Sequence, residues 1–533
     1  MVSSWTGVVL ALLVFMVWRR TRRQSLNDIR GPVVPSRLFG HEKMARYSEE
    51  VGDLELQWGR AFGPTFRTQG CYGEEKLWTA DPKALQHVFH TSGYRYPKGT
   101  LVTEVGKLFS GEGILSAAGD DHRRQRKIMN PAFSTGQLRA FLPVFRRSAA
   151  RLSEKWKEEL QITLPFGGRA INISPMLGRM ALDVVGEAAF DDQFGALDGN
   201  ENELARAFDS LFADSFLHPP PWDILFKATW RYLPPSVLGL IKYLPTKEYK
   251  RFRSYLRVAF RRGKELIEQK SSGAEKGSKD IMSILVQSNL SEDAETRLSE
   301  VEMLSQIATL LIAAHDSIAN TLAWLLYELA RHPEDQQKIR DEIIATRARI
   351  EARHSDDFTP ADLDAMIFTN AVIKESLRLH PVAPVLVREA GYDDILPLAV
   401  PIQTKSGKAT TEIPIASGTQ ITASVWTYNR LESVWGGDAA VWNPARFLDH
   451  KERTNVGVFA NLMTFSAGIR GCIGWRFALL ELQVVLTELI ETFDFRIPKD
   501  VEIVGLNAGI MMPIVKGKLK EGVQVPLHLS VLR

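Results

Sequence analysis

The stretch with the clearest chemical signal is FSAGIRGCIGWR, Phe465 to Arg476. It holds Cys472, one of only two cysteines among 533 residues. Apolar residues at helical spacing begin just after it, so we expect Cys472 at a helix N-terminus, where the partial positive charge lowers a thiol pKa. Gly468, Gly471 and Gly474 allow a tight turn and close approach to a flat ligand. The pattern therefore points to a thiolate presented on a tightly turning loop.

Four roles are open to such a cysteine. A buried structural thiol is the commonest. A zinc site needs several Cys or His ligands at close spacing, and none surround Cys472 in the sequence. A cysteine nucleophile needs a histidine base that can be distant in the chain, so the sequence leaves this role open. A single thiolate can also be the axial ligand of haem iron, for which one cysteine suffices.

Five residues occupy every fixed position of the pattern F-x-x-G-x-R-x-C-x-G: Phe465, Gly468, Arg470, Cys472 and Gly474. The segment resembles the haem-binding signature of the cytochrome P450 family. The resemblance implies haem b (iron protoporphyrin IX) as the cofactor and Cys472 as the thiolate ligand of its iron. It also implies that Arg470 pairs with a haem propionate and that Phe465 and Gly474 belong to the cofactor-binding segment.

A second motif lies in KESLRLHP, where Glu375 and Arg378 are three residues apart and share one helical face. One interpretation is a solvated surface pair, which stabilises little. The resemblance instead implies a buried E-x-x-R element completed by Arg446 in NPARFLD, where Ala445 replaces the glutamate usual in the family. The triad of Glu375, Arg378 and Arg446 is then expected to hold the loop that presents Cys472.

The segment AAHDSIA, residues 313–319, resembles the oxygen-activation motif of the family. The resemblance implies catalytic roles for Asp316, which passes protons, and Ser317, whose hydroxyl holds dioxygen. The sequence departs from the usual motif, because Ala314 replaces glycine, Ser317 replaces threonine and Ile318 replaces a second hydroxyl residue. A helix with one satisfied aspartate and a core-facing serine is the alternative interpretation.

The segment from Gly113 to Phe133 resembles the W-x-x-x-R element of the family, with His122 in place of tryptophan and Arg126 retained. The resemblance implies that His122, Arg126 and Arg388, the last in PVLVREA, donate to haem propionates. Four basic residues cluster here: Arg123, Arg124, Arg126 and Lys127. Such a cluster is ordinarily a solvated basic face, whereas the resemblance implies a docking surface for an acidic reductase.

The N-terminus predicts a membrane anchor. Residues 1–18 carry no charged side chain, and RRTRR follows at once. At about 1.5 Å per residue such a helix spans roughly 27 Å, the thickness of the endoplasmic reticulum hydrocarbon layer. A cleaved signal peptide would have basic residues before the apolar run and a small-residue cleavage site after it. The positive-inside rule then places the rest of the chain in the cytosol.

The predicted fold is mainly α with a small β region, a cytochrome P450 fold behind one transmembrane helix. We divide the chain into an anchor (1–18), a basic and Pro/Gly-rich linker (19–41) and a P450 domain (42–533). Strand patterns occur in GPTFRTQ, TEIPIASGTQITASVW and GVQVPLHLSV. The apolar stretch 304–334 predicts a buried central helix, because polar residues near its middle disfavour a membrane span. Residues 270–280 and 351–360 are expected to be surface loops.

Composition narrows the function. With 66 basic and 63 acidic residues the chain has a net charge of +3, which gives no global field for nucleic acid. Two cysteines argue against a disulfide-stapled secreted scaffold. The resemblance implies a fungal haem-thiolate monooxygenase in the endoplasmic reticulum membrane, supplied with electrons from NADPH by cytochrome P450 reductase.

The substrate implied is a small apolar molecule, terpenoid-like and typical of fungal secondary metabolism. Four segments are expected to shape its pocket: 96–116, 207–240, 381–387 and 507–512. Two alternatives remain open. The chain is a haem-thiolate isomerase or lyase acting on a peroxide without a reductase, or a haem-binding protein without catalytic activity.

Overall fold

The structure is a computed structural model that describes residues 26–163, 170–199, 203–208, 211–271, 279–293, 296–449 and 455–532. The predicted anchor at residues 1–18 and the arginine cluster that follows it lie outside the described residues. Most of the predicted loop at 270–280 does so too. The prediction of a loop at 351–360 is confirmed, because one helix ends at Ala352 and the next begins at Pro360.

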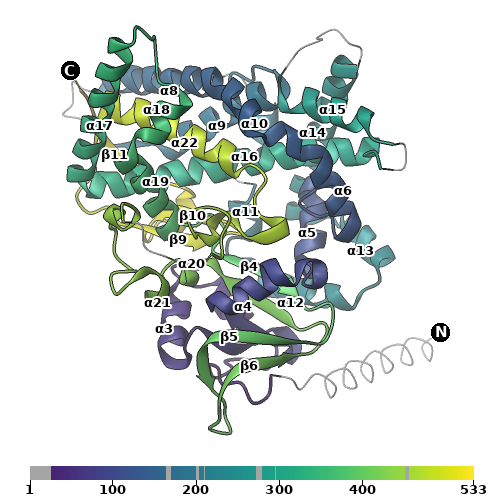
Figure 1. The fold of residues 1–533 in the computed structure, drawn as a ribbon. Coiled ribbons are helices and arrows are strands. Elements are labelled where there is room, and N and C mark those ends of the chain that lie inside the picture. The colour runs from purple at the N-terminus through teal and green to yellow at the C-terminus, as the bar shows by residue number, and fades with distance from the viewer. Residues whose placement is uncertain are drawn as a thin grey trace.

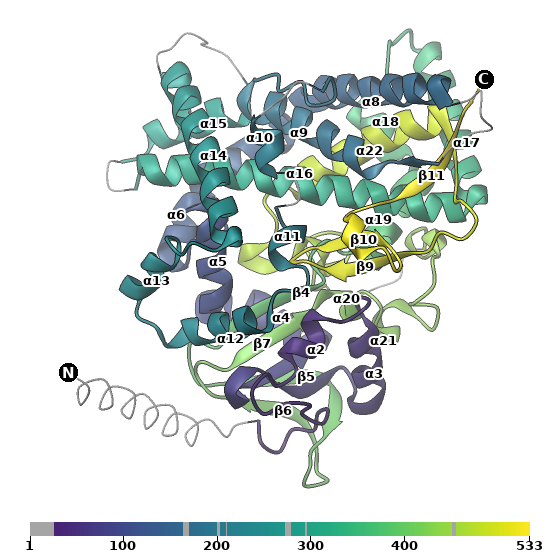
Figure 2. The same cartoon turned by 180° about the vertical axis from the view of Figure 1, so that it is seen from behind.

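Helices make up most of the described chain and form its larger part (Figures 1 and 2). The longer ones are α8 (Leu142–Thr163), α9 (Ser174–Phe190), α14 (Lys247–Ser271), α16 (Glu300–Arg331), α17 (Pro333–Ala352), α19 (Ile367–Leu379) and α22 (Trp475–Thr492). The shorter ones are α2 (Glu42–Arg46), α3 (Asp53–Phe62), α4 (Pro82–Gln86), α5 (Thr100–Ser110), α6 (Gly119–Met129), α7 (Thr135–Leu138), α10 (Glu203–Phe208), α11 (Ala213–Phe216), α12 (Pro221–Thr229), α13 (Pro235–Ile241), α15 (Ile281–Ser291), α18 (Pro360–Ala365), α20 (Val425–Tyr428) and α21 (Glu432–Trp435).

The strands form small sheets, so the predicted fold class is confirmed for the described chain. One sheet has the order β1-β2-β7-β4, and β10-β9, β3-β11-β8 and β5-β6 form the others. Their bounds are β1 (Thr65–Gln69), β2 (Glu75–Thr79), β3 (Ile171–Asn172), β4 (Val385–Glu389), β5 (Asp394–Gln403), β6 (Ala409–Ile415), β7 (Gln420–Ser424), β8 (Phe493–Arg496), β9 (Ile503–Asn507), β10 (Met511–Val515) and β11 (Pro526–Val531). The sequence patterns found β1, β6, β7 and β11 and missed the rest.

Helix α16 is the central helix of the larger part. It begins at a capping box formed by Ser299 and Glu302 and ends before His332 and Pro333. Among the described helices it alone is long and apolar enough to cross a membrane. Most of its most apolar stretch of 18 residues, however, is buried inside the protein. It is therefore the buried core helix that the sequence predicted.

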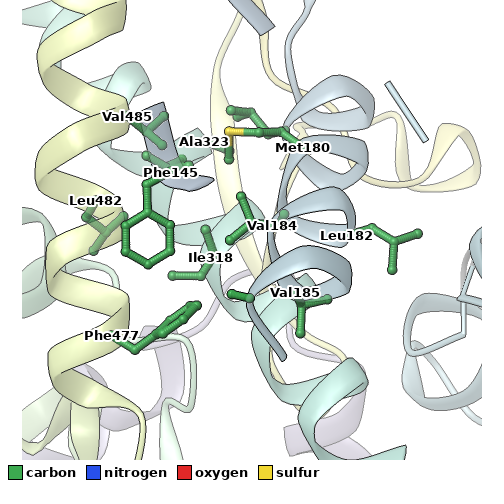
Figure 3. Close-up of a cluster of buried hydrophobic side chains, with 14 of the residues drawn as sticks. Phe145, Met180, Leu182, Val184, Val185, Ile318, Ala323, Phe477, Leu482 and Val485 are labelled. Atoms are coloured by element: carbon green, nitrogen blue, oxygen red, sulfur yellow. The ribbon is translucent and has the colours of Figure 1, made fainter. Parts of the chain in front are cut away.

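An apolar cluster joins α16 to its neighbours (Figure 3). Ile318 of α16 lies among Phe477 of α22, Phe145 of α8 and Val184 of α9. The rings of Phe145 and Phe477 meet edge to face, with centroids 4.9 Å apart. Burying each such side chain stabilises the fold by about 1.5–3 kcal/mol. The cluster thereby fixes the helix that carries Ser317 relative to the helix that follows Cys472.

The mixed sheet brings distant parts of the chain together. Strand β2 pairs in parallel with β7, and β7 pairs antiparallel with β4, where Arg388 lies opposite Ile421. Phe66 and Trp78 stack on one face of this sheet with ring centroids 4.5 Å apart. Arg388 is thus held on a paired strand rather than on a loop.

One buried carboxyl has no stabilising partner. Glu481 of α22 is 1% exposed, and neither of its carboxyl oxygens has a hydrogen-bond partner among the described residues. Burial raises the pKa of Glu481 well above its usual range. The folded protein therefore holds the proton of this side chain more strongly than the unfolded chain does.

We expect Glu481→Met to raise the melting temperature, and to raise it more at pH 8 than at pH 5. In the unfolded chain the carboxyl ionises above about pH 4.3, whereas the folded chain holds the proton, so the wild type loses stability as pH rises. Thermal unfolding at the two pH values measures the difference. Glu412→Gln, at an exposed position of β6, is the control and should shift the melting temperature little at either pH. An equal shift for Glu481→Met at both pH values would contradict a protonated Glu481.

Candidate active site

Cys472 lies in a tight segment between a short 3-10 turn at Gly468–Arg470 and Gly474, the residue that caps α22. Its backbone N–H donates to the carbonyl oxygen of Phe465 at 2.8 Å. Gly468 has φ of +61°, and a Cβ there would overlap the carbonyl oxygen of Phe89. Only glycine fits at this position, so the loop geometry depends on the glycine that the sequence motif fixes.

The environment of the Cys472 thiol differs from the sequence expectation. The side chain is accessible, yet burial raises the pKa of Cys472, while the Gly474 N–H and the Arg126 guanidinium oppose that shift. This direction is opposite to the lowered thiol pKa that the sequence predicted, because the effect of burial outweighs those of the Gly474 N–H and the Arg126 guanidinium.

Four cationic side chains gather near this loop: Lys98, Arg126, Arg388 and Arg470. No described acidic residue forms an ion pair with any of them. Burial, with Arg470 nearby, lowers the pKa of Arg388 to about 9. Burial, Arg388 and Arg470 lower the pKa of Lys98 to about 7. These side chains form a cluster of positive charge in which Arg388 is buried and the other three are half-buried.

Each member of the cluster is held by a carbonyl oxygen. Arg470 Nη1 donates to Ala117 at 3.0 Å, Arg126 Nη1 to Gly471 at 2.5 Å, Arg388 Nη1 to Val387 at 2.9 Å, and Lys98 Nζ to Leu115. Arg470 Nη2 is buried and has no hydrogen-bond partner among the described residues. A buried guanidinium nitrogen without a partner needs an anionic or polar group to satisfy it.

His122 is buried among these cations. Burial and the neighbouring charges, Arg470 first, lower the pKa of His122 to about 3, so its ring is neutral. Nδ1 of His122 lies 2.8 Å from the hydroxyl of Tyr94. When that hydroxyl donates to Nδ1, the ring proton is on Nε2, which leaves an N–H donor toward the cluster.

Glu375, Arg378 and Arg446 form a buried ion-pair network. Arg378 donates to both carboxyl oxygens of Glu375 at 2.7 Å, and Arg446 Nε donates to one of them at 3.1 Å. The side chains of Glu375 and Arg378 are 0% exposed. Arg378 also donates to the carbonyl oxygens of Asn429 and Ala439. The surface-pair interpretation of Glu375 and Arg378 is therefore wrong.

Asp316 and Ser317 lie on an unbroken stretch of α16. Ser317 Oγ donates to the carbonyl oxygen of Ala313 at 2.5 Å, and Asp316 Oδ1 lies 3.0 Å from His315 Nδ1. Ala313 is exposed although the helix around it is mostly buried. A helix residue accessible in the middle of a core faces an internal space, and the Ser317 hydroxyl points to the carbonyl of that residue.

Comparison with known proteins decides the family. The sequence profile described as Cytochrome P450 matches residues 30–520. The chain belongs to the cytochrome P450 family. It is 30% identical to cytochrome P450 monooxygenase 205 of Postia placenta over 99% of this chain and 96% of that protein. It is 32% identical to monooxygenase 128 of the same fungus over 94% and 92%, and 29% identical to monooxygenase claU of Ampulloclitocybe clavipes over 95% and 93%.

The prediction of an oxidoreductase of the monooxygenase type is thus confirmed, and haem b is the cofactor of this P450 family. The residues present fit it. Cys472 offers an accessible sulfur, and the clustered cations with the unpartnered Arg470 Nη2 match two carboxylates. We propose Cys472 as the iron ligand, and Arg470, Arg388, Arg126 and His122 as the donors to the propionates.

Lys98 lies near Arg388 and Arg470 in the same cluster, so we propose it as a fifth donor to the propionates. We expect Lys98→Met to speed haem loss about tenfold or more, because a hydrogen bond to a charged group contributes about 1.5–3 kcal/mol. The measurement is transfer of haem to an excess of a haem-scavenging apoprotein, followed by absorbance. Lys516→Met, on an exposed side chain paired with Glu502, is the matched control. Equal rates of haem loss for Lys98→Met and wild type would contradict the assignment.

The four segments predicted to shape the substrate pocket meet in this P450. Phe109 and Phe212 come from the first two, and their ring centroids are 5.6 Å apart. A Cβ at Gly509 of the last segment would lie 3.5 Å from the ring of Phe216. The N–H of Met511 donates to the carbonyl oxygen of Val382 at 2.7 Å, which joins the third segment to the fourth. Aromatic and aliphatic side chains therefore dominate the meeting point.

The basic cluster of α6 is not a free positive surface. Arg123 pairs with Asp120, Arg124 with Asp121 and Glu302, and Lys127 with Glu292. Arg126 turns inward, where it donates to Gly471. The acids that pair with the exposed members cancel their charge, so the interpretation of this cluster as an electrostatic docking surface is not supported.

Sequence reasoning missed three residues of the site. Two of them, Lys98 and Tyr94, lie in the segment before α5, which contains no recognisable motif. The third is Asp438, whose two carboxyl oxygens accept hydrogen bonds from the side chain of Arg446 at 2.9 and 3.0 Å. Asp438 takes a place in the ion-pair network that also holds Glu375. A signal was present only for Asp438, since Ala445 cannot supply the carboxylate that the family motif usually has at that position.

Proposed function

We propose that this P450 hydroxylates a small apolar molecule, terpenoid-like and made in fungal secondary metabolism. Dioxygen is the co-substrate, and NADPH–cytochrome P450 reductase supplies the electrons. We further propose that residues 1–18 anchor the enzyme in the endoplasmic reticulum membrane and that the domain of residues 42–533 lies in the cytosol. The proposal extends the family assignment to a substrate class, a partner and a location.

The observation that carries the reaction type is the pair Asp316 and Ser317 on α16. A carboxyl and a hydroxyl next to each other can move protons inward, and proton delivery is needed when dioxygen is reduced but not when a peroxide is isomerised. The hydroxyl of Ser317 donates to the carbonyl oxygen of Ala313, and Ala313 is an exposed residue of the helix. The pair therefore favours oxygen activation over the isomerase or lyase alternative.

Each group of residues has a separate task in this proposal. When bound, haem b supplies the redox chemistry that activates dioxygen. Cys472 would supply its sulfur ligand, and the cation cluster around Arg470 and Arg388 would bind the propionates. The Glu375 network holds the Cys472 loop, while Asp316 and Ser317 hold and pass protons.

The side chains at the proposed substrate pocket support the substrate class. Phe109, Phe212 and Phe216 crowd the place where the predicted pocket segments meet, and Gly509 leaves room beside them. Such rings bind an apolar skeleton by burying its surface, at about 25 cal/mol per Å². Bulky hydrocarbon skeletons with few polar groups, as in sesquiterpenes, suit this lining.

The test is a reconstituted system of membranes that contain this P450, a fungal NADPH–cytochrome P450 reductase and a panel of sesquiterpenes under ¹⁸O₂. We expect one labelled oxygen atom in the product and a strict need for both NADPH and reductase. Product from a fatty-acid hydroperoxide without NADPH would favour the lyase alternative. Haem binding with neither reaction would favour the protein without catalytic activity.

A further inference from the structure

His315, the residue before the proposed proton carrier, is tied to it. Nδ1 of His315 lies 3.0 Å from Oδ1 of Asp316, and the two side chains are 15% and 20% exposed. Among the described residues, His315 is the only one whose side chain forms a hydrogen bond with that carboxylate. The motif leaves the position of His315 free, so the resemblance gives it no role.

The helix on the other side of His315 makes room for its ring. Gly178 of α9 faces the imidazole, and a Cβ there would lie 3.3 Å from Nε2. Gly178 has ordinary helical φ and lies inside α9, where glycine costs about 0.5–1 kcal/mol relative to alanine. Backbone geometry does not require glycine here, whereas the space taken by the ring does.

The carboxylate of Asp316 also has neighbours on α14. Tyr255 donates its hydroxyl to the carbonyl oxygen of Ala308 at 2.7 Å, and the charge of Asp316 contributes to the raised pKa of Tyr255. Asn320 donates to the backbone carbonyl of Asp316 at 2.7 Å, not to its carboxylate. The direction of the carboxylate is therefore set by its hydrogen bond with His315.

We propose that His315 is a positioning residue for proton delivery. Its Nδ1–H holds the Asp316 carboxylate in one orientation, and Gly178 provides the space that the His315 ring needs to do so. The proposal rests on the proposed role of Asp316. Without the N–H donor the carboxylate rotates freely and proton delivery loses its direction. Dioxygen that has taken up two electrons and two protons then leaves as hydrogen peroxide before its O–O bond is broken.

The decisive variants are His315→Leu and His315→Asn. Leucine removes the donor, whereas the Nδ2–H of asparagine can replace the Nδ1–H of histidine. We expect His315→Leu to raise hydrogen peroxide formed per NADPH about threefold or more, in line with the loss of one hydrogen bond, and His315→Asn to stay near the wild type. The assay uses reductase and NADPH without added substrate, at equal haem content. Equal peroxide yields for leucine and wild type, or for leucine and asparagine, would overturn the proposal.

Gly178→Ala tests the role of the space, because the histidine is retained and its ring is displaced. We expect a peroxide yield between those of wild type and His315→Leu. A yield equal to that of wild type would show that the ring does not need the space at Gly178, and would remove that part of the proposal.

A second readout does not depend on turnover. Melting temperatures of wild type, His315→Leu, Asp316→Asn and the double variant form a double-mutant cycle. If the two side chains interact, the loss in the double variant is smaller than the sum of the single losses. Additive losses would overturn the contact itself. Should the wild type accept no electrons from reductase, the proposed electron donor fails, while the cycle still decides whether His315 holds the Asp316 carboxylate.

Discussion

Cys472→Ala is expected to abolish the haem-thiolate spectrum and all monooxygenase activity. One sulfur binds the iron, and no described cysteine lies near enough to replace it, since Cys71 is buried against Phe39 in the smaller part of the molecule. The measurement is the difference spectrum of the reduced carbon monoxide complex, in which thiolate ligation gives a Soret band at about 450 nm. We expect that band in the wild type and none in Cys472→Ala.

Cys71→Ala is the matched control, because it removes the other thiol of the chain. Its Sγ lies 3.7 Å from the carbonyl oxygen of Phe39, and burial raises the pKa of Cys71 to about 11, so it is an inert buried thiol. We expect the band to persist and the stability to fall by about 1 kcal/mol. A band that survives in Cys472→Ala would contradict the ligand assignment, and a wild type without haem would return Cys472 to a structural role.

The Cys472 segment was predictable because its determinants are local. Within ten residues, Gly468 makes the turn, Phe465 accepts the N–H of Cys472 and Gly474 caps the next helix. The same holds for Glu375 and Arg378, whose spacing alone puts both on one helical face. Where geometry is set by neighbours in the chain, residue types and spacing are sufficient.

The rest of the site depends on contacts between distant residues. Arg124 pairs at 2.5 Å with Glu302, which is 178 positions away in the sequence. The sequence of α6 alone therefore could not show that the charge of Arg124 is neutralised. Lys98 joins the cation cluster through a loop without a motif. The thiol pKa of Cys472 depends on how much protein surrounds it, which spacing does not report. These properties arise from packing.

The fold divides in the same way. Strands rich in β-branched residues, such as β7 with QITAS, are visible in the sequence. Strand β2, with EKLWT, has few such residues, and it is a strand because β1 and β7 flank it on both sides. The long apolar helix α16 was predictable because its length and pattern are properties of one segment.

Glu375→Gln is expected to lower the free energy of unfolding by about 3–5 kcal/mol and to reduce haem incorporation. The glutamate is the one carboxylate that binds both Arg378 and Arg446, and without it these buried guanidinium groups keep their charge but lose their shared partner. The carbonyl oxygens of Asn429 and Ala439, which Arg378 binds, lie in the segment that leads to the Cys472 loop. Urea unfolding and haem content per protein measure the two effects.

The control for this prediction is Glu521→Gln, which breaks an exposed pair with Lys518 at the same spacing of three residues. We expect a change of about 0–1 kcal/mol there, because water screens the pair and replaces its contacts. Arg378→Lys should resemble Glu375→Gln, since an ammonium group cannot bind both carboxyl oxygens and two carbonyl oxygens in one plane. If Glu375→Gln cost no more than Glu521→Gln, the network would not be what holds the Cys472 loop. If stability fell while haem content stayed at one per chain, the ion-pair network would stabilise the fold but would not be needed for the cofactor site.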